Sequence, residues 1–284
     1  MLRLIGIGLS IDMLPLGNLK KILSCDEIVV DSYTSIWFPS AYLLTSLLIQ
    51  LGKTVIIAPR NYLEGSEVKN LIKRALDKEV CILVTGDPLI ATTHSSIITE
   101  ALANNVEVEV VPAASIFNVS ISLSCLQVYR FGKIVTVVSP KNGIVYEYPY
   151  DVIKMNRLQN LHTLLLLEID VEKNYYMKPY EAIKILLDIQ ERREENIISL
   201  KDIAIILGDV LSCRQKIWIL TIEEILRMQY EFLYNKLYTM IIPSRKLHPV
   251  EEECLNLIRK GKMSYLCAIS EEELKKIAQL IYNQ

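Results

Sequence analysis

The sequence lacks the features that mark most membrane, secreted and nucleic-acid-binding proteins. Its longest apolar stretches, such as residues 42–51 and 164–167, are far shorter than the roughly 18 apolar residues that a membrane-spanning helix needs. The amino-terminal residues do not read as a signal peptide, because strand-like residues begin at Leu2. The formal net charge of −2 gives no case for binding nucleic acid or a membrane surface. We therefore expect a soluble, cytoplasmic protein with no direct nucleic-acid or membrane partner.

Cysteine motifs are also absent. The sequence has no Cys-x-x-Cys pair, and no histidine stands at metal-ligand spacing from a cysteine. The cysteines are scattered over mostly apolar segments, where a free cysteine behaves as a small hydrophobic residue. This scatter predicts a reducing compartment, no disulfide framework and no zinc site. The cysteines are Cys25, Cys81, Cys125, Cys213, Cys254 and Cys267.

A third glycine is missing from the first predicted turn. Gly6 and Gly8 lie at the end of residues 2–7, which read as a short buried strand. A dinucleotide-binding fingerprint would need another glycine at position 11, where the chain has Ile11. This argues against a dinucleotide site.

The hydrophobic residues, 51% of 284, are enough for a large core and two ordinary domains. In the first half, short strands alternate with helices across short links. This alternation is typical of a mostly parallel, doubly wound sheet. The predicted strands are 2–7, 27–30, 54–58, 80–84 and 106–111, and the predicted helices are 16–24, 39–51, 64–78 and 95–102.

The pattern changes at Pro-Ala-Ala-Ser, residues 112–115, which we interpret as a hinge. We expect residues 1–112 to form an N-terminal α/β domain with a parallel sheet. Residues 113–284 would form a C-terminal α/β domain with a mixed sheet, because several strands there are separated by hairpin-length links. The predicted strands are 134–139, 162–169, 202–207, 216–221 and 237–243, and the predicted helices are 116–126, 179–193, 222–228, 249–259 and 271–282.

Residues 85–94 are the strongest candidate for a binding loop. They follow the apolar run 80–84, so they would leave the carboxyl edge of a parallel sheet, where open α/β folds bind ligands. Gly86 permits a sharp turn and Pro88 fixes its own φ, which would hold Asp87 at the strand tip, able to bind a small polar ligand. An ordinary turn uses the same residue types, so these three residues alone do not distinguish a binding loop from an ordinary turn.

The longer stretch Gly-Asp-Pro-Leu-Ile-Ala-Thr-Thr-His, residues 86–94, resembles the signature loop of the diphthine synthases. Other segments are similar to motifs of the same family in matching order and spacing. They are Ile-Gly-Ile-Gly-Leu at 5–9, Tyr-Thr-Ser at 33–35, Ala-Ser-Ile-Phe-Asn at 114–118, Leu-Gln-Val-Tyr-Arg-Phe-Gly at 126–132, Asn-Arg at 156–157, Leu-His-Thr-Leu at 161–164, Leu-Glu-Ile at 167–169 and Leu-His-Pro-Val-Glu at 247–251.

The resemblance implies two α/β domains of the tetrapyrrole methylase type, the class III S-adenosylmethionine methyltransferases, with the active site in the interdomain cleft. It implies S-adenosylmethionine as the cofactor, S-adenosylhomocysteine as its product, and no metal. An apolar slot with a few fixed polar groups suits such a ligand, although each aliphatic residue taken singly suits plain core packing as well. The positions that match the family's cofactor contacts are Leu9, Asp87, Ile90, Ser115, Ile116, Leu167, Leu207 and Tyr238.

The chain departs from the family pattern in three places. Where the family usually has Ala-Arg before a Gly-containing loop, this chain has Ile-Ile-Leu-Gly at 205–208, and Tyr238 stands where the family commonly has histidine. The Asp-Ile-Thr that usually follows Leu9 is missing as well. These departures lie among the predicted cofactor contacts, so they would affect how the substrate is handled.

The resemblance also implies the reaction. The family methylates the amine of a 3-amino-3-carboxypropyl group on a histidine of translation elongation factor 2, giving diphthine or its methyl ester. We expect this protein substrate and a homodimer. Alignment for such a transfer contributes roughly 7–11 kcal/mol in well-oriented systems.

Histidine is the usual candidate for a base at neutral pH. However, we expect His94 to cap a helix start, His162 to pin a strand end and His248 to begin a helix, so no catalytic residue is assigned.

Two other functions are considered. The first is a methylase of a small tetrapyrrole of the precorrin type, which the motifs at 91–94 and 126–132 disfavour. The second is an inert binding module that kept the fold and lost the cofactor, which the residues Ile206 and Tyr238 suggest.

Overall fold

The structure is a computed structural model that describes residues 1–261, 263 and 267–282. The chain divides into two compact units. Unit 1 comprises residues 1–116, 170–173 and the described part of 266–284, and unit 2 comprises 117–169 and the described part of 174–265. The domain boundary predicted from the sequence, between residues 112 and 113, places the last helix in the C-terminal domain. In the structure α11 (Glu271–Tyr282) belongs to unit 1, because Leu274 and Ala278 lie in that unit's core.

Unit 1 is built on a five-stranded parallel sheet in the order β3-β2-β4-β1-β5. The three central strands are fully or almost fully buried, as their aliphatic sequences predict. All five predicted strands form in this unit. They are β1 (Leu2–Gly6), β2 (Glu27–Asp31), β3 (Thr54–Ala58), β4 (Val80–Val84) and β5 (Val108–Val111).

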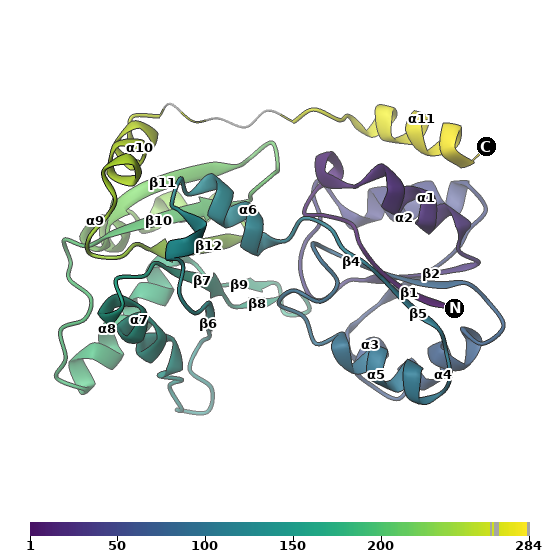
Figure 1. Cartoon of the computed structure of the whole chain (residues 1–284), viewed down its shortest axis with the longest axis horizontal. Helices are drawn as coiled ribbons and strands as arrows, with labels where there is room; N and C mark the ends of the chain where they lie inside the picture. The colour runs from purple at the N-terminus through teal and green to yellow at the C-terminus, as the bar shows by residue number, and fades with distance from the viewer. Residues whose placement is uncertain (262, 264–266, 283–284) are drawn as a thin grey trace. The chain divides into compact units, whose positions relative to one another are not determined.

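Helices cover both faces of this sheet (Figure 1). The helices α1 (Leu16–Ser24), α2 (Ala41–Gln50) and α11 lie on one face, and α3 (Arg60–Leu63), α4 (Glu67–Arg74) and α5 (Ser95–Ala103) lie on the other. The helix predicted over 64–78 forms as the shorter α4, which begins after Gly65, and the short α3 before it was not predicted. A Cβ at Gly65 would lie only 2.1 Å from the Asn61 carbonyl oxygen.

Unit 2 contains a mixed sheet in the order β11-β10-β12-β7-β6. Only β6 and β7 run parallel, and the other neighbours are antiparallel, as the hairpin-length links predict. A two-stranded sheet pairs β8 (Ile169–Asp170) with β9 (Tyr175–Tyr176). The main strands are β6 (Val135–Val137), β7 (Thr163–Leu167), β10 (Ile203–Gly208), β11 (Lys216–Thr221) and β12 (Tyr238–Ile242).

The core of unit 2 lies between this sheet and α7 (Tyr148–Leu158), α8 (Pro179–Arg192) and α9 (Ile222–Arg227). Helix α7 is not predicted from the sequence, although Pro149 in its first turn is a typical start signal. The remaining helices are α6 (Ile116–Leu123), α10 (Pro249–Arg259) and the short η1 (Ile11–Met13), η2 (Val128–Arg130) and η3 (Gln229–Leu233). Within the described residues, no helix is long and apolar enough to cross a membrane.

Each unit contains a disulfide. In unit 1 Cys25, which follows α1, is bonded to Cys81 in β4. In unit 2 Cys125, which follows α6, is bonded to Cys254 in α10. The prediction of no disulfide framework is therefore wrong. The partners are far apart in the sequence, at separations of 56 and 129 residues, so local spacing gives no sign of them.

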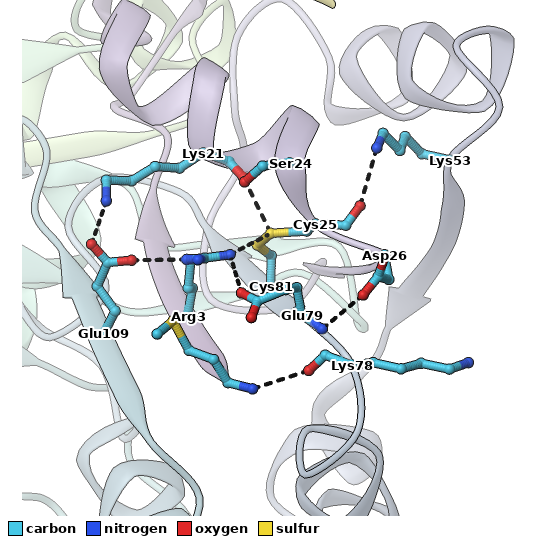
Figure 2. Close-up of a disulfide and its surroundings, with 11 residues drawn as sticks. Arg3, Lys21, Ser24, Cys25, Asp26, Lys53, Lys78, Glu79, Cys81 and Glu109 are labelled. Carbon is cyan, nitrogen blue, oxygen red and sulfur yellow. Dashed lines mark hydrogen bonds and ion pairs between the residues drawn. A yellow bond between two sulfur atoms is a disulfide. The ribbon is translucent and has the colours of Figure 1, made fainter.

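A charged cluster surrounds the disulfide of unit 1 (Figure 2). The Arg3 guanidinium, from β1, lies 3.7 Å from the Cys25 sulfur and pairs with the carboxylates of Glu79 and Glu109. Lys21 from α1 also pairs with Glu109, which lowers the pKa of that carboxyl. These contacts join three elements of the unit at the end opposite to the loop at residues 85–94.

Candidate functional site

The loop at residues 85–94 begins where two adjacent parallel strands end. The Gly86 N–H donates to the Gly8 carbonyl oxygen at 2.8 Å, and the Gly8 N–H donates to the Gly86 carbonyl at 3.3 Å. The backbone angle φ is +68° at Gly8 and +81° at Gly86, and glycine adopts such positive values at little cost. A Cβ at Gly8 would also lie 2.3 Å from the Met13 carbonyl oxygen. The tips of β1 and β4 therefore turn together at the carboxyl edge of the sheet.

Asp87 fixes the shape of this loop. One carboxylate oxygen accepts the Leu89 N–H at 3.0 Å, and the other accepts the Ala113 N–H at 3.2 Å. The first bond closes the turn within the loop, and the second ties it to the segment between β5 and α6. Asp87 therefore organises the edge of the sheet, in addition to any contact with a ligand.

The other predicted cofactor residues of unit 1 lie around the same turn. Leu9 and Ser115 are buried beside Gly86, since a Cβ at Gly86 would lie 3.5 Å from Leu9 Cδ2 and 3.8 Å from Ser115 Cα. Ile116 is half-buried at the start of α6. Ile90 lies in the exposed tip of the loop with 39% of its surface accessible. Unit 1 thus brings its predicted residues to one edge.

His94 ends the loop with a fully buried ring. Its Nδ1 lies 3.2 Å from the Pro88 carbonyl oxygen, and its Nε2 lies 3.5 Å from Asp31 Oδ2 and 3.4 Å from the Tyr33 hydroxyl. The expected helix cap is wrong. Residue 94 has helical backbone angles, φ −67° and ψ −11°, and its side chain makes no capping bond. The ring instead bridges the loop and the end of β2.

Tyr33 and Glu64 extend this cluster toward solvent. The buried Tyr33 hydroxyl donates to Glu64 Oε1 at 3.2 Å, and the Thr93 hydroxyl donates to the same oxygen at 2.7 Å. Burial, helped by Asp31 and Glu64, raises the pKa of Tyr33, so this phenol stays protonated. Burial also tends to raise the pKa of Glu64, but the bonds from Thr93 and Arg60 outweigh it and lower that pKa.

Asp31, Tyr33 and Glu64 have no role predicted from the sequence. A usable signal exists for the first two, because Asp31 ends β2 directly before the motif at 33–35. Strand β2 pairs with β4, so its tip must lie beside the loop that follows β4. Glu64 has no such signal, since it follows the short helix α3.

The predicted cofactor residues of unit 2 are all buried and lie on three neighbouring strands. They are Leu167 at the end of β7, Leu207 in β10 and Tyr238 in β12. They do not share one face. Leu167 and Tyr238 pack in the core beneath the helices, whereas Leu207 alternates with Ile206 and lies on the other face of the sheet.

Tyr238 is held within an aromatic group. Its ring packs against Trp218 and Phe232, with centroids 6.1 and 5.8 Å away, and its hydroxyl donates to the Phe232 carbonyl at 2.9 Å. Burial raises its pKa. The Lys178 ammonium lies 5.1 Å from the ring centroid. Tyrosine at this position therefore completes the core of unit 2.

Three of the family-like segments meet in unit 2 at one buried carboxylate, Glu251. It accepts the backbone N–H groups of Gln127 and His248, both at 2.9 Å, and the Nε2–H of His162 at 3.2 Å. Arg130 forms an ion pair with it. These residues come from segments 126–132, 161–164 and 247–251, so the network attaches α10 to the sheet.

His162 has a structural role, as expected. Its Nδ1 accepts the Ser244 N–H at 3.0 Å, so the neutral ring carries its proton on Nε2 and donates it to Glu251. Burial lowers the pKa of His162, which keeps the ring neutral. Burial tends to raise the pKa of Glu251, but its backbone donors and nearby charges outweigh that and lower it. His248 begins α10 as predicted, and its Nδ1 accepts the Val250 N–H at 3.3 Å.

The described residues contain no group of three or more histidine, cysteine, aspartate or glutamate side chains that could hold a metal ion.

Comparisons with known proteins agree with this arrangement. The family model for tetrapyrrole (corrin/porphyrin) methylases matches residues 1–226. The chain therefore belongs to the tetrapyrrole methylase family.

Its relatives narrow this assignment. It is 34% identical to the diphthine synthase of Sulfurisphaera tokodaii over 91% of this chain and 99% of that one. It is 36% identical to the diphthine synthase of Staphylothermus marinus over 95% of each chain. A crystal structure of a diphthine synthase, 29% identical, superposes with a TM-score of 0.78 over 91% of this chain and 96% of that one.

Within the family, the chain belongs to the diphthine synthases. It is an enzyme, a methyltransferase of diphthamide biosynthesis, and so requires a methyl donor. The fold class predicted from the sequence is confirmed, and the alternative functions are not favoured.

Proposed function

We propose that this enzyme uses S-adenosylmethionine to methylate the amine of a 3-amino-3-carboxypropyl group on a histidine of translation elongation factor 2. The observation that carries the proposal is the loop at residues 86–94. It resembles the signature loop of the family, and it lies at the carboxyl edge of a parallel sheet, where ligands bind in open α/β folds.

The residues at this edge fit the proposed donor. Leu89 and Ile90 expose 38% and 39% of their surfaces, which offers apolar contact area to an adenine ring. The small residues Ala113, Ala114 and Ser115 follow β5 and leave their backbone approachable. The Ser10 hydroxyl is buried and has no hydrogen-bond partner among the described residues, so one polar group there is still available. When bound, S-adenosylmethionine supplies an electrophilic methyl group.

We propose that two sets of residues bind the methyl donor. Leu9, Asp87, Ile90, Ser115 and Ile116 would bind it from unit 1. Leu167, Leu207 and Tyr238 would contribute from unit 2. Because the Tyr238 hydroxyl already bonds to Phe232, we expect its backbone to make the contact.

Elongation factor 2 acts in the cytoplasm, so we place the enzyme there, and we expect a homodimer from the family resemblance. The disulfides do not exclude this location, because disulfide-rich intracellular proteins are known, those of hyperthermophiles among them. Light scattering that gives the mass of a single chain would contradict the dimer.

Mass spectrometry of elongation factor 2 tests the proposal. The enzyme is incubated with S-adenosylmethionine and elongation factor 2 that carries the 3-amino-3-carboxypropyl histidine. We expect stepwise addition of methyl groups to the peptide with that histidine, and the number of steps distinguishes a trimethyl from a tetramethyl product. Elongation factor 2 with an unmodified histidine is the control and should gain none. Methylation of a precorrin and not of the modified factor would contradict the proposal.

A further inference from the structure

The ring of His94 is the link between the exposed loop and the rigid sheet. Its exposed fraction is 1%, and it contacts the Pro88 carbonyl on one side and Asp31 on the other. Asp31 is itself held at the end of β2, because its Oδ1 accepts the N–H groups of Tyr33 and Thr34 at 3.0 and 3.1 Å. The Pro88 carbonyl is thereby connected through one side chain to a fixed strand end.

The loop has few other ties. Asp87 fixes its first turn through Leu89 and Ala113, and the Thr92 hydroxyl reaches the Pro88 carbonyl at 2.7 Å from within the loop. The Thr93 hydroxyl also reaches Glu64, which follows α3, at 2.7 Å. Between these points the tip is exposed, and Ala91 has a positive φ of 59°, a conformation that is unfavourable for alanine. His94 therefore provides the tie between the second half of the loop and another strand.

We infer that His94 is a positioning residue for the methyl donor, which holds the Pro88 carbonyl and thereby the exposed Leu89 and Ile90 in their binding arrangement. The inference rests on the proposed function, since it assigns a role within that site. A buried side chain that holds a ligand-binding loop acts by pre-organisation, so its loss weakens binding without removing any direct contact.

Two substitutions at position 94 separate this role from general packing. Asn places its amide nitrogen as far along the side chain as Nδ1 of histidine, so His94→Asn retains a donor for the Pro88 carbonyl. Gln places its amide nitrogen where Nε2 lies. In His94→Gln this amide therefore faces Asp31, and the hydrogen bond to the Pro88 carbonyl is lost. Both substitutions leave a smaller side chain in the same buried site, and a packing role would not rank them in this order.

The experiment is calorimetric titration of S-adenosylhomocysteine into the full chain and its variants. We expect His94→Gln to weaken affinity roughly tenfold or more. His94→Asn should weaken it by a smaller factor, roughly threefold, because it keeps the donor for Pro88 and loses only the contact with Asp31. His162→Gln is the matched control: it alters the other fully buried histidine beside a carboxylate, so it should lower the melting temperature without a comparable loss of affinity. Equal binding by parent and His94→Gln, or equal losses in the Asn and Gln variants, would overturn the inference.

A second variant decides the matter if His94→Gln does not fold. Asp31→Asn retains an oxygen for the N–H groups of Tyr33 and Thr34 and replaces Oδ2, the oxygen that faces His94 and also accepts the Thr34 hydroxyl. We expect faster amide hydrogen exchange in residues 88–94, unchanged exchange in β1 and β4, and weaker binding. Parent-like exchange and affinity would overturn the inference. A parent chain that binds no S-adenosylhomocysteine at millimolar concentration would instead overturn the proposed function, and the inference with it.

Discussion

Two buried histidines, one in each unit, have different structural roles. His94 and His162 are 1% and 0% exposed, and each lies beside a buried carboxylate. His162 accepts a backbone N–H at Nδ1, so its proton is on Nε2, whereas His94 faces a carbonyl at Nδ1, so it carries a proton there. The first joins a helix to a sheet within the core. The second holds a loop whose tip is exposed.

This difference separates a stability network in unit 2 from a positioning network in unit 1. The largest expected effect is on unit 2. Glu251→Ala removes the acceptor of four groups and leaves Arg130 and His162 without their carboxylate. Losing one partner of a buried ion pair typically costs about 3–5 kcal/mol. Urea unfolding should show a loss of this size, with methyl-donor affinity retained by the folded fraction.

Glu252→Ala, at an exposed position of the same helix, is the control and should change stability by less than about 0.5 kcal/mol. A Glu251→Ala variant as stable as this control would show that the network does not hold α10.

The disulfides compare the two units directly. Replacing Cys25 and Cys81 together by alanine should lower the free energy of unfolding by about 2–4 kcal/mol, because the cross-link restricts the unfolded chain. The same change at Cys125 and Cys254 should cost up to about 1 kcal/mol more, since the enclosed loop is longer. Denaturant unfolding of the oxidised parent and both double variants measures this. Variants as stable as the parent would mean that the cross-links add nothing.

Asp87 tests the positioning network. Asp87→Ala removes the acceptor of the Leu89 and Ala113 N–H groups, so the loop loses its first turn and its tie to the segment before α6. We expect roughly tenfold weaker binding of S-adenosylhomocysteine. Asp87→Asn keeps one oxygen acceptor and should fall between Asp87→Ala and the parent. Unchanged affinity in Asp87→Ala would remove Asp87 from the site.

The smallest effect is the pH dependence of stability. The pKa of His162 is lowered by burial from its ordinary 6.5, so below that pH the unfolded chain binds more protons than the folded chain. Stability should therefore fall as the pH decreases from 6.5. A further fall should begin near 4.5, because the folded-state pKa of Glu251 is also lowered. Urea midpoints measured across this range should show both falls in the parent, and the fall that begins at pH 6.5 should be absent in His162→Gln. An identical profile in that variant would contradict the assignment.

Much of the fold could be predicted because its signals are local. Aliphatic runs predict the five strands of unit 1, and hairpin-length links predict the mixed sheet of unit 2. Helix α11 was predicted as part of the C-terminal domain but packs in the core of unit 1. The sequence of an amphipathic helix does not show which surface the helix covers. The disulfides were missed for the same reason, because their cysteines meet only after the strands are assembled.

The candidate site was predicted where chain order determines proximity. The family resemblance assigned Leu9, Asp87 and Ser115 to one site, and they lie around Gly86, since parallel strands bring their tips together. That they bind the methyl donor stays a prediction. The contact between His94 and Asp31 was not predicted. It depends on the direction of a side chain, and the helical backbone of residue 94 turns the ring away from the capping position.

The central claim is that the edge formed by residues 85–94 and 113–115 binds the methyl donor. Calorimetric titration of S-adenosylhomocysteine into the parent and into Ser115→Trp tests it most directly, with circular dichroism to show that both are folded. The account predicts clear binding by the parent, and no detectable binding by the folded variant because the indole fills the space beside Gly86. Normal binding by folded Ser115→Trp would contradict it.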